Sequence, residues 1–204
     1  MAEKELTVEE LCEGALRRKK DLAKLAENLS GASRRDRQMS ATALAMAAKQ
    51  DPKRVAEVIE ALVDALNRPE AQTRWECLDA LTELVAVDTR GCEKAIEGAD
   101  AALFDEDNGP VRLAAMRFLC ALGATTANRS EKVWPLIDEA IQCYHGDLEF
   151  QDMLVAVIGF SEGALSADVK KELRNRMTFD ANNAKGVLQK RADQIVKNTR
   201  KKAK

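Results

Sequence analysis

Aromatic residues, histidine and proline are scarce in this chain of 204 residues. Aromatic side chains make up 4% of the sequence, and the single histidine is His145. β-Branched residues occur singly and never in alternating runs of strand length, so no strand is predicted. Alanine, leucine, glutamate, lysine and arginine dominate instead, and these residues favour helices. The composition therefore predicts an all-α protein.

Long apolar runs and paired cysteine motifs are also missing. No stretch of about eighteen apolar residues occurs, and the charged N-terminus lacks the apolar core of a signal peptide. The cysteines are odd in number, show no CxxC spacing, and each lies at or beside an apolar helical position: Cys12, Cys77, Cys92, Cys120 and Cys143. We expect reduced, buried thiols in a cytoplasmic protein.

No motif for catalysis, cofactor binding or metal binding is apparent. Without a second histidine or a nucleophile elbow, neither a Ser-His-Asp nor a Cys-His arrangement can be argued. Cys143 and His145 do not have the spacing of a convincing zinc pair, and the end of a helix suits a histidine in any case. No GxGxxG or P-loop motif occurs. The sequence therefore predicts a protein that is not an enzyme, with no catalytic residue, no metal and no cofactor.

A helical repeat of about 38 residues organises the chain. Val55, Val58, Ile59, Leu62, Val63 and Leu66 form one apolar helix face. Shifting this frame by 37 residues gives Cys92, Ala95, Ile96, Ala99, Asp100 and Leu103, and shifting it by 78 gives Val133, Leu136, Ile137, Ala140, Ile141 and Tyr144. Only Asp100 is polar, and it either marks the edge of the stripe or belongs to an acidic surface. The recurrence predicts stacked helical repeats.

The helix before each of these frames repeats as well. Each carries an arginine, a small residue three positions later and a leucine four positions after that: Arg37, Ser40 and Leu44; Arg74, Cys77 and Leu81; Arg112, Ala115 and Leu119. A small side chain lets neighbouring helices approach closely, while the leucine fills the seam between them.

The third copy resembles the HEAT repeat. Residues 107–112 read Asp-Asn-Gly-Pro-Val-Arg and are followed by Ala115, Leu119, Leu122 and Gly123. The resemblance implies two antiparallel helices per repeat, with the second helices lining the inner face of a right-handed α-α superhelix. We expect about four helix pairs: 36–49 with 53–67, 71–86 with 90–104, 110–122 with 131–144, and 149–161 with 167–178. Asp51, Ser130 and Ser166 are expected N-caps.

The chain is predicted to form one HEAT-like repeat domain over residues 1–204. The four helix pairs occupy residues 33–180. A capping helix is expected in residues 1–32, where Thr7 and Glu10 form a capping box, and a second capping helix in residues 181–196. Residues 197–204 are expected to be a basic, frayed tail.

Charge is distributed unevenly although the formal net charge is only -2. Residues 51–110 carry 15 acidic and 6 basic side chains. The expected function is a protein-interaction scaffold or adaptor that binds a basic protein segment at the acidic middle repeats, along the inner face. The candidate partner-binding residues are Glu57, Glu60, Asp64, Glu93, Glu97, Asp100 and Asp138.

The C-terminal part is basic, with 12 basic and 4 acidic side chains in residues 164–204. A nucleic-acid-associated protein is the alternative function, using a basic patch of Lys170, Lys171, Arg174, Arg176, Lys190 and Arg191. The basic end could also dock on the acidic middle of another copy. Either charged surface could equally be an ordinary solvated face.

One enzymatic class has a related architecture, the HEAT-like DNA glycosylases, which use a carboxylate, aromatic residues and a basic inner face. The candidate residues here would be Trp75, Trp134 and Asp138. Acidic middle repeats would repel the DNA backbone, so this alternative is disfavoured.

Overall fold

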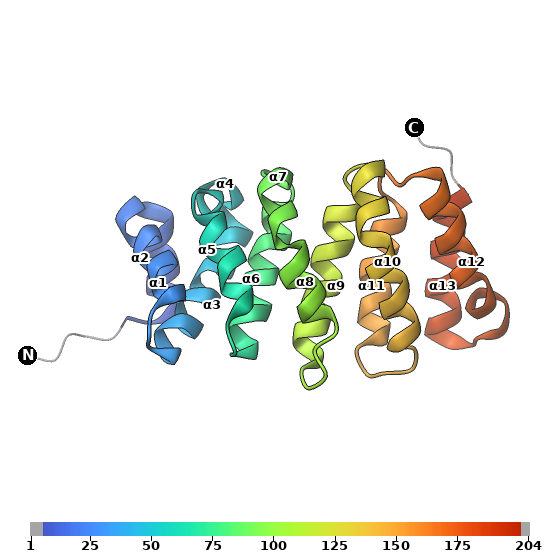
Figure 1. The fold of residues 1–204 in the computed structure, drawn as a ribbon, viewed down its shortest axis with the longest axis horizontal. Coiled ribbons are helices and arrows are strands. Elements are labelled where there is room, and N and C mark those ends of the chain that lie inside the picture. The colour runs from blue at the N-terminus through green and yellow to red at the C-terminus, as the bar shows by residue number, and fades with distance from the viewer. Residues whose placement is uncertain (1–5, 201–204) are drawn as a thin grey trace, which may run out of the picture. The chain divides into compact units, whose positions relative to one another are not determined.

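The computed structural model describes residues 6–200, which contain helices and no strand. The described chain divides into two compact units, residues 1–102 and 103–204, of which residues 1–5 and 201–204 are outside the description. The prediction of one continuous domain stays a prediction. Figure 1 shows the helices of the chain.

The first unit contains the expected first two repeats and an N-terminal helix pair. Its long helices are α1 (Val8–Arg17), α2 (Lys19–Ser30), α3 (Arg34–Gln50) and α6 (Ala71–Leu84). The second helix of each repeat is divided by 3-10 turns: α4 (Pro52–Val55), η1 (Ala56–Val58), α5 (Ile59–Asp64) and η2 (Ala65–Asn67), then α7 (Thr89–Cys92), η3 (Glu93–Ala95) and α8 (Ile96–Leu103). The first helices α3 and α6 pack together, and the second helices α2, α5 and α7 form a neighbouring row.

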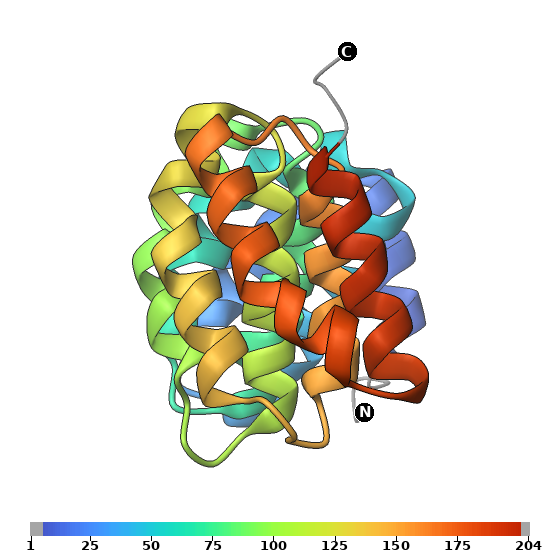
Figure 2. The ribbon, with the colours of Figure 1, turned by 90° about the vertical axis from the view of Figure 1, so that its right-hand side faces the viewer.

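The second unit contains α9 (Gly109–Gly123), α10 (Ala127–Cys143), α11 (Phe150–Ser161), α12 (Ala167–Asn183) and α13 (Gly186–Arg200). Here α9, α11 and α13 form one row, and α10 packs beside α12 in the other. Figure 2 shows α12 and α13 side by side at the C-terminal end of this unit. Helices therefore occupy the segments expected for the helix pairs, but α12 packs chiefly on α13 rather than on α11.

The predicted single capping helix in residues 1–32 is wrong, because two helices occupy this segment. The capping box of Thr7 and Glu10 is confirmed at the start of α1. Arg18 is extended, with φ -129° and ψ 126°, and separates α1 from α2. Residues 17–20 are all exposed and basic, so the chain can fold back there without exposing an apolar side chain. Both helices pack on α3.

The predicted C-terminal boundaries are also partly wrong. α12 continues to Asn183 and α13 extends from Gly186 to Arg200, rather than from 181 to 196. Asn198 is buried and its Nδ2 donates to Ser161 Oγ at 3.0 Å, which holds the last turn of α13 against α11. Residues 197–200 are therefore helical and not a frayed tail, while residues 201–204 lie outside the described residues.

The expected N-caps are confirmed at two of three positions. Asp51 caps α4 through Arg54 N at 3.1 Å, and Ser166 caps α12 through Val169 N at 3.3 Å. Ser130 is wrong as a cap because α10 begins earlier, with Thr126 as its N-cap. Ser130 is instead buried inside the helix and accepts a hydrogen bond from Ser166 N at 3.1 Å.

Candidate functional site: two surfaces on the second helices

The candidate acidic residues of the first unit lie on two neighbouring second helices. Glu57, Glu60 and Asp64 lie on η1 and α5, and Glu93, Glu97 and Asp100 lie on η3 and α8; we call these six residues the acidic row. Two glycines bring the helices close together. A Cβ at Gly91 would lie 2.8 Å from Ile59 Cδ1, and one at Gly98 would lie 2.8 Å from Leu66 Cβ.

Two members of the acidic row are neutralised within the chain. Glu57 Oε1 lies 3.3 Å from Arg54 Nη1, and Glu57 Oε2 lies 3.3 Å from Lys19 Nζ. Glu60 forms an ion pair with Lys94 of the neighbouring helix. These charges are therefore compensated before any partner arrives, and they contribute less to steering than the sequence indicated.

Three members of the acidic row keep their charge available. Asp64 and Glu97 are exposed and Asp100 is half-buried. None of the three forms an ion pair with any residue between 6 and 200. They come from α5 and α8, so the uncompensated negative charge spans two consecutive repeats.

Several other carboxylates of the acidic segment serve the fold. Asp51 and Asp88 cap helices, the latter accepting from Gly91 N at 2.9 Å. Glu70 is buried and pairs with Arg37. The excess of acidic residues over 51–110 therefore overstates the charge that a ligand would meet.

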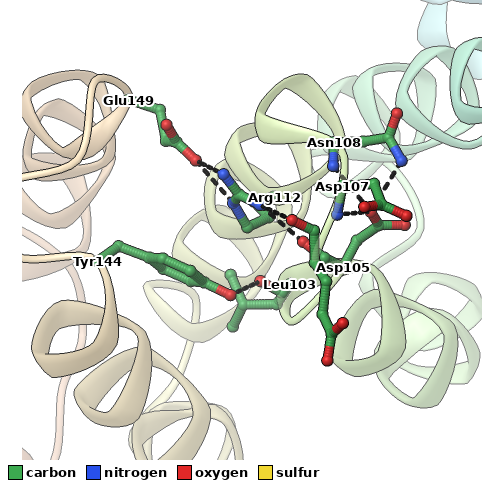
Figure 3. Close-up of polar contacts among 8 residues, drawn as sticks. Leu103, Asp105, Asp107, Asn108, Arg112, Tyr144 and Glu149 are labelled. Carbon is green, nitrogen blue, oxygen red and sulfur yellow. Dashed lines mark hydrogen bonds and ion pairs between the residues drawn. The ribbon is translucent and has the colours of Figure 1, made fainter.

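Arg112, the repeated arginine of α9, forms a clamp between repeats. Arg112 Nη1 donates to Asp105 O at 2.7 Å, and Arg112 Nε donates to Glu149 Oε1 at 2.6 Å (Figure 3). Glu149 is the N-cap residue of α11, so the arginine joins the loop before its own helix to the start of the next one. Tyr144 adds a hydrogen bond from its hydroxyl to Leu103 O at 2.9 Å.

Arg37 makes the equivalent clamp in the first unit. Its Nη1 donates to Gly31 O at 2.7 Å and to Ala32 O at 2.9 Å, and its Nε donates to Glu70 Oε2 at 3.2 Å. Hydrogen bonding from Arg37 lowers the pKa of Glu70, against the opposing effect of burial. The repeated arginines are evident in the sequence, but their partners are not. The sequence signal that could have identified these partners is a glutamate directly before the first helix of the following repeat.

Asp138 of the acidic set and Arg176 of the basic set contact one another. Arg176 Nε and Nη2 donate to the Asp138 carboxylate at 2.6 and 2.9 Å, a bidentate pair between α10 and α12. The hydrogen bonds to Asp138 raise the pKa of Arg176. The two residues belong to separate predicted patches, and the structure brings them together.

Trp134 is a packing residue of the second unit. It is buried, its ring stacks on Phe160 with centroids 6.4 Å apart, and its indole N–H donates to Glu172. Asp138 is held by Arg176 and by Gln142 Nε2, the latter at 3.1 Å. This arrangement does not present Trp134 to a flipped base, which removes one residue on which the DNA glycosylase alternative depended.

A groove lies between α10 and α12 around the exposed ring of Phe179. It consists of two adjoining hollows.

 The two hollows of this groove, of about 550 and 320 Å³, share Arg176 and Phe179 in their lining. We call the whole the Phe179 groove; its lining residues are Asp138, Ile141, Gln142, His145, Glu172, Asn175, Arg176, Phe179 and Asp180. It is a mixed surface in which an aromatic ring lies among carboxylates.

The predicted basic patch is divided by the structure. Arg176 is paired with Asp138, and Arg191 Nη1 donates to Gln151 Oε1 at 3.0 Å, which holds α13 to α11. The remaining members form no ion pair within residues 6–200: Lys170, Lys171, Arg174 and Lys190. Helical periodicity places Lys170 and Arg174 on the flank of α12 opposite Glu172 and Arg176. The nucleic-acid alternative stays a prediction.

His145 and Cys143 do not form a metal site together with other ligands. Within the described chain there is no group of three or more His, Cys, Asp or Glu residues that could hold a metal ion. His145 Nε2 lies 3.2 Å from Asp180 Oδ2, and its ring lies 4.9 Å from that of Phe150. The histidine therefore joins the end of α10 to α12.

The predicted burial of the cysteines is confirmed at four positions and wrong at one. All five thiols are free; Cys12, Cys77, Cys92 and Cys120 are buried, whereas Cys143 is exposed. Burial raises the pKa of the Cys92 thiol to about 12. Cys143 is exposed because it is the last residue of α10 and lies next to the solvated loop at 144–149.

Comparison with solved structures identifies the fold. An engineered protein has a TM-score of 0.74 at 17% identity, covering 95% of this chain and 90% of that one. A designed armadillo repeat protein in complex with the peptide (KR)4 has a TM-score of 0.73 at 14% identity, covering 94% and 91%. The archaeal HEAT-like repeats protein from Thermococcus onnurineus NA1 has a TM-score of 0.56 at 15% identity, covering 97% and 98%.

These likenesses show that the chain has an armadillo/HEAT-like helical repeat fold, which confirms the predicted fold class. This fold is typical of protein-binding scaffolds, whose stacked repeats present extended binding surfaces. No family model matches the sequence. No curated protein matches it significantly either. Among the described helices, none is both long and apolar enough to cross a membrane.

Proposed function

We propose that this protein is a non-catalytic scaffold that binds a basic, extended peptide segment of a partner protein along the second helices of its first unit. The observation that carries the proposal is the set of three carboxylates, Asp64, Glu97 and Asp100, which have no ionic partner among the described residues. Their charge extends over two consecutive repeats. A peptide with alternating basic side chains would meet complementary charge along this surface.

A designed relative supports the choice of ligand. The designed armadillo repeat protein with a similar fold was solved with the peptide (KR)4, which consists of lysine and arginine. Another similar structure is described as a designed armadillo repeat protein for modular peptide recognition. A basic peptide is also the ligand proposed for this chain, because the unpaired carboxylates of the chain would complement the positive charge of the peptide.

Fluorescence anisotropy with a labelled octapeptide of alternating lysine and arginine tests the proposal. The triple variant Asp64→Asn, Glu97→Gln, Asp100→Asn should weaken binding roughly tenfold, since three ionic contacts of about 0.5 kcal/mol each are lost. The affinity should also fall as salt is raised.

A matched variant separates a specific surface from overall charge. Glu9→Gln, Glu13→Gln, Glu83→Gln removes the same charge from exposed positions on α1 and α6, outside the acidic row. It should leave the peptide affinity within about twofold of wild type. Equal losses in both triple variants would mean that net charge alone attracts the peptide, and the proposed surface would then be wrong.

A further inference from the structure

Phe179 on α12 is an aromatic side chain that the fold leaves in water. It is 72% exposed, and it lines both hollows of the Phe179 groove. The core of the second unit buries other large aromatic side chains, including Phe118, Phe150 and Phe160. An exposed ring beside two hollows is the type of feature that marks a contact surface.

The charge of the groove favours a cationic group of a ligand. Its lining contains three carboxylates, those of Asp138, Glu172 and Asp180, and one guanidinium, that of Arg176. The bidentate pair of Asp138 and Arg176 is neutral. Glu172 accepts the indole N–H of Trp134 but forms no ion pair within residues 6–200. The groove therefore carries excess negative charge.

The spacing of Glu172 and Phe179 fits one long side chain. They are seven positions apart along α12, which places them on the same flank and about 10 Å apart along the helix axis. A lysine or arginine side chain has an apolar stem that can cover the aromatic ring and a cationic head that can reach a carboxylate.

We propose that the Phe179 groove binds a lysine or arginine side chain of a peptide partner, with the stem on Phe179 and the cation at Glu172. This inference deepens the proposed function and rests on it for the peptide nature of the partner. It adds a contact in the second unit that does not involve the acidic row.

Trp134 offers a local readout, because its indole N–H donates to Glu172 and the chain contains only one other tryptophan. In a Trp75→Phe background, titration with the alternating lysine-arginine octapeptide should change the emission of Trp134 in a saturable manner. Phe179→Ala should raise the Kd about fivefold and Glu172→Gln about threefold. Glutamine keeps an acceptor for the Trp134 indole, so this variant should fold normally.

Two controls match these variants. Val187→Ala removes an exposed apolar side chain outside the groove lining, and Glu139→Gln removes an exposed carboxylate of α10 outside it. Both should bind the peptide as wild type does. If each control weakened binding as much as its groove variant, the groove would have no specific role.

The other outcomes separate this inference from the proposed function. Peptide binding by anisotropy with unchanged Trp134 emission would overturn the groove assignment and leave the acidic row intact. Loss of affinity in Phe179→Ala but not in the acidic-row triple variant would support the groove and contradict the acidic row. Preferential binding of an alternating glutamate octapeptide, or self-association that Phe179→Ala abolishes, would assign the groove to another partner and overturn the inference.

Discussion

The guanidinium of Arg112 contacts Glu149 through Nε at 2.6 Å, joining α9 to the first residue before α11. Both side chains are largely buried, at 14% and 13% exposure. The same guanidinium donates to the Asp105 carbonyl oxygen at 2.7 Å. The Arg112 side chain therefore donates a hydrogen bond to a loop carbonyl and connects two repeats.

Removal of this clamp should destabilise the protein strongly. Arg112→Ala leaves the Glu149 carboxylate partly buried without its partner, and we expect a loss of about 3 kcal/mol in the free energy of unfolding. Arg117→Ala, which removes an exposed arginine from the same helix, should change it by less than about 0.5 kcal/mol. Urea denaturation followed by circular dichroism measures both, and equal midpoints would show that the clamp contributes little.

The pair of Arg37 and Glu70 should make stability depend on pH in the acid range. The pKa of Glu70 is lowered from its ordinary value of 4.5, first by hydrogen bonding from Arg37. The unfolded chain then binds this proton more readily than the folded one, so the contribution is complete above pH 4.5 and is lost as the pH falls through the lowered value.

Urea midpoints of the wild type and Glu70→Gln between pH 7 and pH 2.5 measure this effect. The wild type should be more stable near pH 7, and the difference between the two proteins should shrink on acidification. A difference that stayed constant over this range would contradict a lowered pKa of Glu70.

Thiol accessibility should distinguish Cys143 from the other four cysteines. Cys143 is exposed, whereas burial raises the pKa of the thiols of Cys77, Cys92 and Cys120, and also that of Cys12. Iodoacetamide at pH 8 should therefore add one label to the folded protein and five in urea, as measured by intact mass. Cys143→Ser should remove the native label; a label remaining at full rate would mean that another thiol is accessible.

Replacement of two glycines by alanine should change the stability of the protein in opposite directions. A Cβ at Gly123 would lie 2.4 Å from Val133 Cγ2 and 2.8 Å from Phe160 Cε2, so Gly123→Ala should cost about 1–3 kcal/mol through overpacking. At Gly159, inside α11, a Cβ would meet nothing within 4 Å. Gly159→Ala should stabilise the helix by about 0.5–1 kcal/mol. Thermal melts of the two variants test the contrast, which a shift in the same direction would contradict.

The helices and their apolar faces were predictable because periodicity is a local property. The frame of Val55, Ile59 and Leu62 and its copies lie on second helices, and all three of these residues are buried. The break at Arg18 was not predictable in the same way. Cys12, Ala15, Leu22, Leu25 and Leu29 keep a helical spacing across it, and only packing of both segments on α3 requires the chain to fold back.

The sequence indicated which residues were candidates for a binding site, but not which of them form an available charged surface. Glu57, Glu60 and Asp138 were recognised as charged candidates, yet their charge is compensated by partners from other helices. Phe179 was not identified, because one apolar residue in a polar stretch carries no periodic signal.

The sequence by itself determined the all-α class, the repeat length and the helices that carry the charged residues, since these follow from spacing along a single chain. Only the tertiary structure decided which charges remain available. An ion pair between repeats, such as that of Asp138 and Arg176, joins residues 38 positions apart, and its existence depends on how neighbouring helices align. That alignment is set by close contacts such as Gly98 on Leu66, where the absence of a side chain lets two backbones approach.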